Sequence, residues 1–324
     1  MTLIGILLTS LITLVQLNCE NFFDCYDDST KNDNEFTPES LRGWSHKKFR
    51  QKADHLSQEI ISCGKDGDDW HLPDLVALCE VESRYAMDYL TRQTPLFSLG
   101  YDYVKTESPD LRGINVALMY RQGSIKLLKS YPLRVKPLEG MRPTRDILYV
   151  SCRTDTGDTL HVFVTHAPSK LGGDKMTQPY RLKVMERICA SADSIRRLSP
   201  RANIIVTGDF NDDSQSATIQ QLISNGFQSI SSDAKGMFGN DVHGTYKYKG
   251  EWENIDHIMV SGDIASWQIS CQINDSHFLL EKDKEYGGNK PLRTFYGMKF
   301  QNGYSDHMPL VGRFVKRRQN KSRE

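Results

Sequence analysis

Short apolar segments recur along this chain, and most of them run directly into a hydrogen-bonding or acidic residue. Leu75–Cys79 leads to Glu80, and Ile204–Thr207 leads through Gly208 to Asp209. The same pattern places polar groups at Asn18 and Glu20, at His166, at Asn211, at Asp256, and at Asp306 with His307. Because the ends of neighbouring strands converge at one edge of a sheet, these residues are expected to meet in a single site.

Each of these polar residues also has an ordinary structural explanation. A lone Asp or Glu after a strand commonly caps a helix or forms a turn, and a lone His is commonly a satisfied core or surface residue. Their joint occurrence favours a functional site over these structural roles. Carboxylates with an amide and without cysteine suit Mg²⁺ or Mn²⁺ better than zinc. Asp and His together can also transfer protons near neutral pH. The set therefore predicts attack of water on a phosphate ester.

The spacing of the apolar residues predicts an α/β fold. Expected strands lie at 12–17, 75–78, 115–120, 147–152, 160–165, 203–207 and 255–260, and expected helices at 44–62, 84–93, 181–197 and 216–225. Three strands fall between residues 111 and 165 with little room for helices, which indicates antiparallel neighbours. Without a long linker, we expect one domain over residues 1–324, with two mixed sheets flanked by helices.

Composition excludes several classes of site. Lys plus Arg equals Asp plus Glu, 41 each, so no global positive field indicates nucleic-acid binding, and a polyanion would be held locally. The seven cysteines are scattered and never spaced as C-x-x-C, which argues against a thiolate metal site. The glycine pairs Gly172–Gly173 and Gly287–Gly288 do not belong to the strand-to-helix glycine motifs that bind nucleotides. Residues 313–324 are basic and are expected to form a solvated tail.

The apolar stretch from Leu3 to Leu17 bears on location. It is shorter than a membrane span, no Lys or Arg precedes it, and no A-x-A-like cleavage site follows it. Residues 12–17 are better explained as a buried strand, whereas residues 1–11 leave a residual export signal open. The sequence thus favours a cytoplasmic protein without a stable membrane span, and an exported form stays open.

Six motifs together resemble a known superfamily. They are NCENFFD at 18–24, LCEVE at 78–82, THAP at 165–168, GDFND at 208–212, IDHI at 255–258 and SDHMP at 305–309. In this order they resemble the endonuclease/exonuclease/phosphatase superfamily, which includes pancreatic deoxyribonuclease, apurinic endonucleases, sphingomyelinases and inositol-phosphate 5-phosphatases. The resemblance spans residues 14–312. It implies a four-layer α/β sandwich of two mixed β-sheets flanked by helices.

The resemblance also implies roles for the site residues. Glu80 resembles the principal metal ligand, with Asp306 and either Asn18 or Glu20 completing the shell around Mg²⁺ or Mn²⁺, directly or through water. His307 resembles either the general base or a residue that contacts the scissile phosphate, and Asp256 resembles the carboxylate that orients it. The remaining candidates are Asp209 and Asn211, which would position or activate water, and His166 and Arg145, which would bind phosphate together with Asn211.

The function that this resemblance implies is a divalent-metal-dependent hydrolase of phosphate esters. A phosphodiesterase or endonuclease acting on DNA or RNA is preferred. A phospholipid or inositol-phosphate phosphodiesterase or phosphatase, and a catalytically silent binding protein, are the alternatives.

Two segments near the last motifs have local patterns of their own. Residues 282–302 interleave basic and aromatic side chains, which indicates either a lip that contacts substrate or a solvated insertion. Residues 245–252 are predicted to form a hairpin with its turn at Lys249 and Gly250. A monomer is expected.

Overall fold

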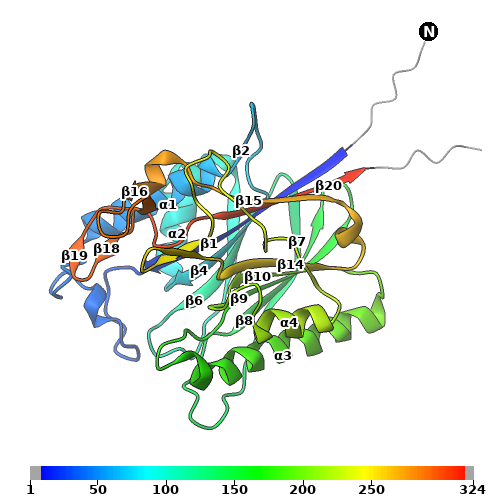
Figure 1. Ribbon diagram of the computed structural model, residues 1–324, viewed down its shortest axis with the longest axis horizontal. Coiled ribbons are helices and arrows are strands. Elements are labelled where there is room, and N and C mark those ends of the chain that lie inside the picture. Colours follow the sequence, from blue (N-terminus) through cyan, green and yellow to red (C-terminus); the bar gives the residue numbers. More distant parts are fainter. Residues whose placement is uncertain (1–8, 318–324) are drawn as a thin grey trace, which may run out of the picture.

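Two six-stranded sheets pack face to face in the computed structural model, which describes residues 9–317 (Figure 1). The first sheet has the order β15-β20-β1-β4-β6-β5 and the second the order β11-β14-β10-β9-β8-β7. The strands of the first sheet are β1 (Thr9–Phe22), β4 (Leu75–Val81), β5 (Tyr101–Lys105), β6 (Asn115–Arg121), β15 (Gln268–Ile273) and β20 (Leu310–Arg317). Those of the second are β7 (Ile125–Leu133), β8 (Ile147–Thr154), β9 (Thr159–His166), β10 (Asn203–Asp209), β11 (Gln228–Ser229) and β14 (Asp256–Ser261).

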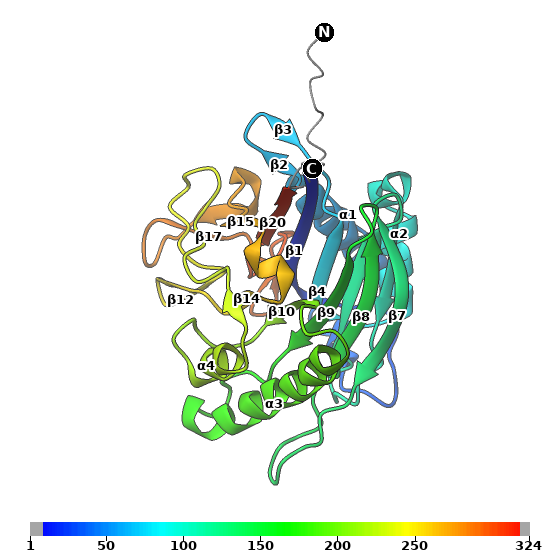
Figure 2. The same cartoon turned by 90° about the vertical axis from the view of Figure 1, so that its right-hand side faces the viewer.

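Helices cover the outer face of each sheet. The first sheet is covered by α1 (His46–Ser62) and α2 (Arg84–Arg92), and the second by α3 (Asp174–Leu198) and α4 (Ala217–Ser224), which lie below it in Figure 1. Figure 2 shows the two sheets nearly edge-on with α3 outside the second. The predicted four-layer sandwich of two mixed sheets is therefore confirmed.

Central strands are apolar on both faces because each layer boundary has its own core. In β10, Ile205 packs between the sheets, whereas Ile204 and Val206 pack under α3 and α4. In β4, Ala77 packs between the sheets and Val76 packs against α1 and α2. Strands buried on both faces read as continuous apolar runs. This is why the sequence showed these central strands clearly.

Two parallel strand pairs lie near the centres of the sheets and fix the place of the site. β1 runs parallel to β4 and β9 runs parallel to β10, whereas the other pairs within the two sheets are antiparallel. The carboxyl ends of the parallel strands carry Asn18, Glu80, His166 and Asp209. Each pair thus delivers two polar residues to one edge of its sheet.

The apolar N-terminal stretch corrects the expectation about location. From Thr9 onward it forms β1, whose residues Leu14, Val15 and Leu17 are fully buried between neighbouring strands. We expected a cytoplasmic protein and left export through this stretch open. That expectation is wrong, because the described part of the stretch is a buried strand and gives no information on location. Residues 1–8 of the possible signal at 1–11 lie outside the described residues. Within residues 9–317, no helix is long and apolar enough to cross a membrane.

Two boundaries also differ from expectation. Residues 313–317 belong to β20 rather than to a solvated tail, because Arg313 is buried and donates to the carbonyl oxygens of Cys63 and Lys65. Residues 318–324 lie outside the described part. Helix α3 begins at Asp174 rather than at 181, with Pro179 inside it. Pro179 lies past the first turn, so it removes the hydrogen bond that an N–H there would donate to the carbonyl oxygen of Lys175, yet the helix continues through it to Leu198.

Gly208 allows β10 to approach β9 at the residue before Asp209. Its φ is +149°, and a Cβ atom there would lie 1.8 Å from the carbonyl oxygen of Thr165. Any side chain would push the two strands apart where His166 and Asp209 face each other. Glycine at this position therefore serves both stability and the site.

We expect Gly208→Ala to lower the free energy of unfolding by about 3 kcal/mol or more, since backbone rather than a flexible side chain would have to move. Denaturant unfolding measures it. Gly123→Ala is the matched control, because its Cβ would meet nothing within 4 Å. Equal stability of the two variants would contradict the close approach.

Candidate active site

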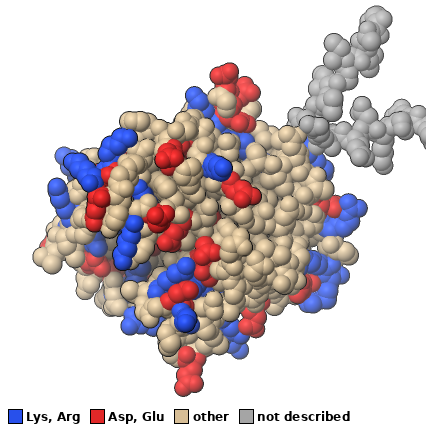
Figure 3. Space-filling view, viewed as in Figure 1, with Lys and Arg blue, Asp and Glu red and all other residues tan. Residues whose placement is uncertain are grey.

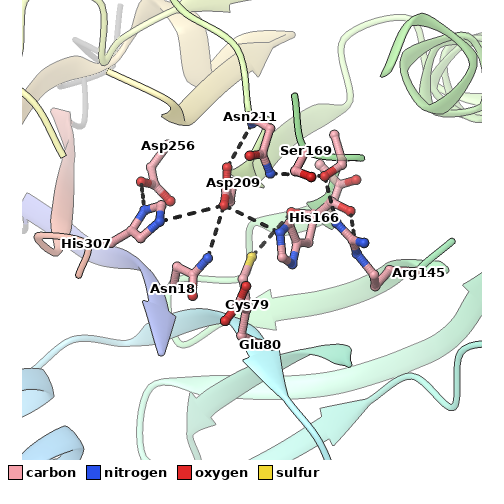
Figure 4. A network of polar contacts seen from close by, with 12 residues as sticks. Asn18, Cys79, Glu80, Arg145, His166, Ser169, Asp209, Asn211, Asp256 and His307 are labelled. Carbon is pink, nitrogen blue, oxygen red and sulfur yellow. Dashed lines mark hydrogen bonds and ion pairs between the residues drawn. The ribbon is translucent and has the colours of Figure 1, made fainter. Parts of the chain in front are cut away.

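A cavity of ≈ 590 Å³ opens at the edge where the parallel strands end. Seven of the residues expected in the site line it together with Arg145, namely Asn18, Glu80, His166, Asp209, Asn211, Asp306 and His307. Figure 4 shows Asn18, His166, Asn211 and His307 around Asp209. Asp256 lies behind His307, and Glu20 is not among the lining residues.

Three of these positions have a left-handed backbone. The φ angles are +48° at Glu20, +60° at Glu80 and +52° at Asn211. Side chains other than glycine rarely adopt such angles, and they concentrate at functional sites. The register of β1 against β4 shifts between Asn18 and Phe22, and that of β4 against β6 between Cys79 and Val81. These bulges re-aim the residues at the strand ends.

Asp209 is the centre of the polar network. Its Oδ2 accepts a hydrogen bond from Nδ2 of Asn18 at 3.0 Å, and its Oδ1 accepts one from the N–H of Asn211 at 2.8 Å. Nε2 of His166 and of His307 lie 3.5 Å and 3.9 Å from Oδ2. Burial and the charge of Asp256 raise the pKa of Asp209 to about 7, partly opposed by His307. The carboxylate can therefore take up a proton near neutral pH.

His307 and Asp256 form a buried pair. Nδ1 of His307 donates to Oδ2 of Asp256 at 2.7 Å, and the other oxygen, Oδ1, accepts from Nε2 of Gln16 at 3.3 Å. Burial lowers the pKa of His307, but the charge and hydrogen bond of Asp256 outweigh it and raise the pKa to about 10. The imidazole is therefore charged at neutral pH, with Nε2–H directed towards the cavity side where Asp209 lies.

His166 has the opposite character. Burial, followed by the charges of Arg145, Arg112 and His307, lowers its pKa well below the ordinary value. The ring is thus neutral, and its Nδ1 is buried without a hydrogen-bond partner among the described residues. A neutral and a charged imidazole therefore flank Asp209.

The loop before β20 is anchored to the end of β1. Oγ of Ser305 donates to the carbonyl oxygen of Asn18 at 2.6 Å and accepts from the N–H of His307 at 3.1 Å. Asp306 accepts from Nη2 of Arg293 at 2.9 Å, and Nε of Arg293 donates to Glu20 at 3.1 Å. Arg293, which lies outside the six motifs, thus links two expected metal ligands.

Two expected roles change in the structure. Glu20 accepts from the N–H groups of Thr294 and Phe295 as well as from Arg293, so its carboxylate holds the 293–295 segment instead of facing the cavity. Arg145 donates to the carbonyl oxygens of His166 and Ala167 and pairs with Asp110 at 3.4 Å. The guanidinium of Arg145 therefore supports the turn after β9. The side chain also forms part of the cavity wall.

The donor set fits a hard divalent cation at Glu80 and Asp306. Asn21 N–H donates to Oε2 of Glu80 at 2.9 Å, and no other hydrogen bond to this carboxylate occurs within residues 9–317. Asp209, Asp256 and His307 also place one ligand atom each within 4.8 Å of one another. The short hydrogen bond between Asp256 and the charged His307 makes that trio a proton-transfer group rather than a cation cage. Oxygen ligands of this kind suit Mg²⁺ or Mn²⁺.

Sequence reasoning missed two contributors to the site. Gln16 interrupts an apolar strand, and a polar residue at a fully buried strand position was the available signal. Tyr246 places its ring 4.9 Å from that of His307 and lines the cavity. Nothing in the sequence spacing connected Tyr246 to His307, since the contact depends on how a hairpin folds over the loop before β20.

Comparison with known proteins identifies relatives of this arrangement. The model of the Endonuclease/Exonuclease/phosphatase family matches residues 13–316. No curated protein matches the chain in sequence. An endonuclease/exonuclease/phosphatase family protein from Bacteroides thetaiotaomicron is 16% identical, with 98% of this chain and 99% of that chain covered and a TM-score of 0.62.

Two further solved structures share the fold. A mannosyl-6-phosphatase from Bacteroides thetaiotaomicron is 17% identical, covers 94% of this chain and 100% of its own, and gives a TM-score of 0.61. The human nocturnin catalytic domain with a bound sulfate anion is 17% identical, with 94% of both chains covered and a TM-score of 0.56. At such identities the likeness concerns the fold alone.

The His307–Asp256 pair generates a prediction for pH. In metal-free protein, NMR should show His307 protonated until about pH 10, and Asp256→Asn should make it titrate at a clearly lower pH. A raised histidine pKa adds stability that is complete below the ordinary value of 6.5 and is lost as pH rises towards about 10. Asp256→Asn should therefore reduce that loss of stability between these pH values.

His161 provides an internal control in the same spectra, because its pKa is lowered by burial and it lies on β9 away from the pair. Its titration should be the same in both proteins. If His307 titrated at the same pH with and without the Asp256 carboxylate, the electrostatic account of the pair would be wrong.

Proposed function

This chain belongs to the endonuclease/exonuclease/phosphatase family, and we propose that it is a divalent-metal-dependent hydrolase that cleaves phosphate esters in the cavity around Asp209. The observation that carries the proposal is the placement of the buried Asp209 carboxylate between two imidazoles, with Glu80 and Asp306 in the wall of the same cavity. Such a set can accept a proton from water and stabilise negative charge on phosphate at the same time.

The roles of the side chains follow from their protonation. His307 is charged, so its Nε2–H donates to a non-bridging phosphate oxygen, and this supports the second of its two expected roles. Asp209 accepts the proton of the attacking water, whose oxygen forms the new bond to phosphorus. The bond from phosphorus to the ester oxygen breaks, and that oxygen leaves with a proton from solvent. Asp256 and Gln16 hold the imidazole in place.

Glu80 and Asp306, with Asn18, are the residues that would hold the cation. When bound, a divalent cation neutralises charge on the phosphate and polarises its oxygens. Glu20 is left out of this set, because its oxygens are taken by Arg293, Thr294 and Phe295. The cation is proposed to be Mg²⁺, with Mn²⁺ as the substitute.

The finer proposal is a phosphodiesterase or endonuclease that acts on nucleic acid. Three basic residues line the cavity within a chain whose net charge is zero. Arg145 and Lys170 pair with Asp110 and Asp212, whereas Arg112 has no ion pair among the described residues. Phosphate would thus be attracted locally instead of by a long-range field. All of the proposed catalytic residues are present, which argues against a silent binding protein.

We expect Asp209→Asn and His307→Ala each to lower kcat by about 100-fold or more, since each removes a proton acceptor or donor from the transition state. Hydrolysis is measured with Mg²⁺ on single-stranded DNA, RNA, abasic DNA, sphingomyelin and phosphoinositides, with and without a chelator. Exposed Glu139→Gln is the matched control, because Glu139 does not line the cavity. Activity that survives both the chelator and Glu80→Gln would overturn the metal-dependent proposal.

Glu80 and Glu20 are separated by a binding experiment. Calorimetric titration with Mg²⁺ should show that Glu80→Gln weakens affinity by more than the roughly tenfold loss typical of changes behind the ligands. Glu20→Gln should lower the melting temperature, because it disturbs the buried contacts with residues 293–295, and should weaken Mg²⁺ binding far less. Equal losses of affinity would return Glu20 to the ligand set.

A further inference from the structure

A second cavity, of ≈ 360 Å³, adjoins the catalytic one. Tyr246, Tyr248 and Asp306 line both. Its other walls come from the hairpins β12–β13 and β16–β17 and from β18, at the left end of Figure 1. These strands are β12 (Tyr246–Tyr248), β13 (Glu251–Glu253), β16 (Leu280–Lys282), β17 (Asn289–Pro291) and β18 (Phe295–Tyr296). We call it the tyrosine cavity, after Tyr248, Tyr286 and Tyr296 in its walls.

Buried contacts fix the walls of the tyrosine cavity. Lys247 and Asp283 form an ion pair at 3.2 Å whose side chains are only 6% and 5% exposed. Nζ of Lys247 also donates to the carbonyl oxygens of Gly287 and Asn289, so it joins β12 to the β16–β17 hairpin. Because its charge is matched by Asp283, Lys247 holds the frame and is not available to a ligand.

Gly250 brings the two hairpins into direct contact. A Cβ atom there would lie 2.8 Å from Cβ of Tyr286, and its φ is +90°. The turn at Lys249 and Gly250, which the sequence predicted, therefore packs against Tyr286 and sets the place of that ring. The predicted hairpin is present. Residues 283–296 line a cavity beside the site, whereas their contact with substrate stays a prediction.

Three tyrosine rings remain open on this rigid frame. Tyr248, Tyr286 and Tyr296 are 52%, 52% and 61% exposed. Nζ of Lys249 lies 5.3 Å from the centre of the Tyr248 ring, and Nζ of Lys290 lies 5.6 Å from that of Tyr296. Lys249 has no ion pair within the described residues, and Lys290 has a weak one with Glu281 at 3.7 Å. Figure 3 shows basic side chains gathered at this end of the molecule, with acidic ones between them.

Exposed rings beside the ammonium groups of Lys249 and Lys290 suit a ligand with a flat ring and a negative charge. Nucleobases stack on aromatic side chains, and the adjoining phosphate pairs with Lys. A lipid chain would need a continuous apolar wall, and Lys249, Glu285, Lys290 and Arg293 interrupt this one. The size of the cavity and its shared wall with the catalytic site leave room for a single unit of a chain.

We propose that the tyrosine cavity binds the nucleotide next to the scissile phosphate, so that the substrate is a nucleic-acid strand with unpaired bases. This inference rests on the proposed function, because it assigns a substrate to the same active site. Tyr286 and Tyr296 stack on the base, and Lys249 and Lys290 pair with the neighbouring phosphate. Tyr246 and Tyr248 form the wall between the two cavities.

The test compares a short single-stranded oligonucleotide with dimethyl phosphate, a small diester without an aromatic ring to stack in the tyrosine cavity. Because each variant loses one stacking ring, Tyr286→Ala and Tyr296→Ala should each lower the ratio of kcat/KM for oligonucleotide over small diester by about tenfold. KM for the oligonucleotide should carry most of this change. Phe97→Ala is the matched control, because this ring is 68% exposed and lies on a 3-10 helix outside both cavities.

The same variants are tested for direct binding by fluorescence anisotropy of a labelled oligonucleotide, which does not require turnover. Weaker binding in the two variants, with Phe97→Ala like the wild type, supports the subsite even if no ester is cleaved and the proposed function fails. Equal losses on both substrates, or a wild type that hydrolyses the small diester or a sugar or lipid phosphate but neither binds nor cleaves the oligonucleotide, overturn the subsite and leave the proposed function standing.

Discussion

Two hydrogen bonds cross the apolar core and join the sheets at the edge where the site lies. Nδ2 of Asn18 on β1 donates to Asp209 on β10, and Nε2 of Gln16 on β1 donates to Asp256 on β14. Both acceptors are buried carboxylates, for which an unpaired arrangement is costly. These bonds therefore fix how the two sheets are placed relative to each other at this edge. The distances among Asp209, His307 and His166 depend on that placement.

Opposite protonation of two similar side chains is a consequence of this geometry. His307 has Asp256 at 2.7 Å and stays charged, whereas His166 has only the more distant Asp209 at 3.5 Å, with Arg145 and Arg112 near it, and stays neutral. Asp209 then lies between a donor and a neutral ring, and burial holds its pKa near neutrality. Pairs of groups whose surroundings separate their pKa values are typical of acid–base chemistry.

The sequence predicted the central strands and the site edge because their signals are local. Apolar runs buried on both faces end in polar residues, and Gly208 and Asp209 stand at such an end. It did not predict β5, β7 and β15, whose exposed positions break the apolar run, nor the inner strand β20, whose last residues it assigned to a basic tail. Nor could it show that Glu20 turns away to the 293–295 segment or that Arg145 binds backbone carbonyls. Those contacts join residues far apart in the chain, and only tertiary packing sets them.

Strand β1 pairs with β20, which is made last among the described elements, and β1 supplies Asn18 and Gln16 to the site. During synthesis on the ribosome, β1 is therefore made well before β20 and lacks this neighbour until β20 has been translated. Its apolar edge must stay unpaired throughout that interval, and such edges are prone to aggregate. The edge of β1 that β20 covers is therefore exposed to aggregation for as long as the intervening residues are being made.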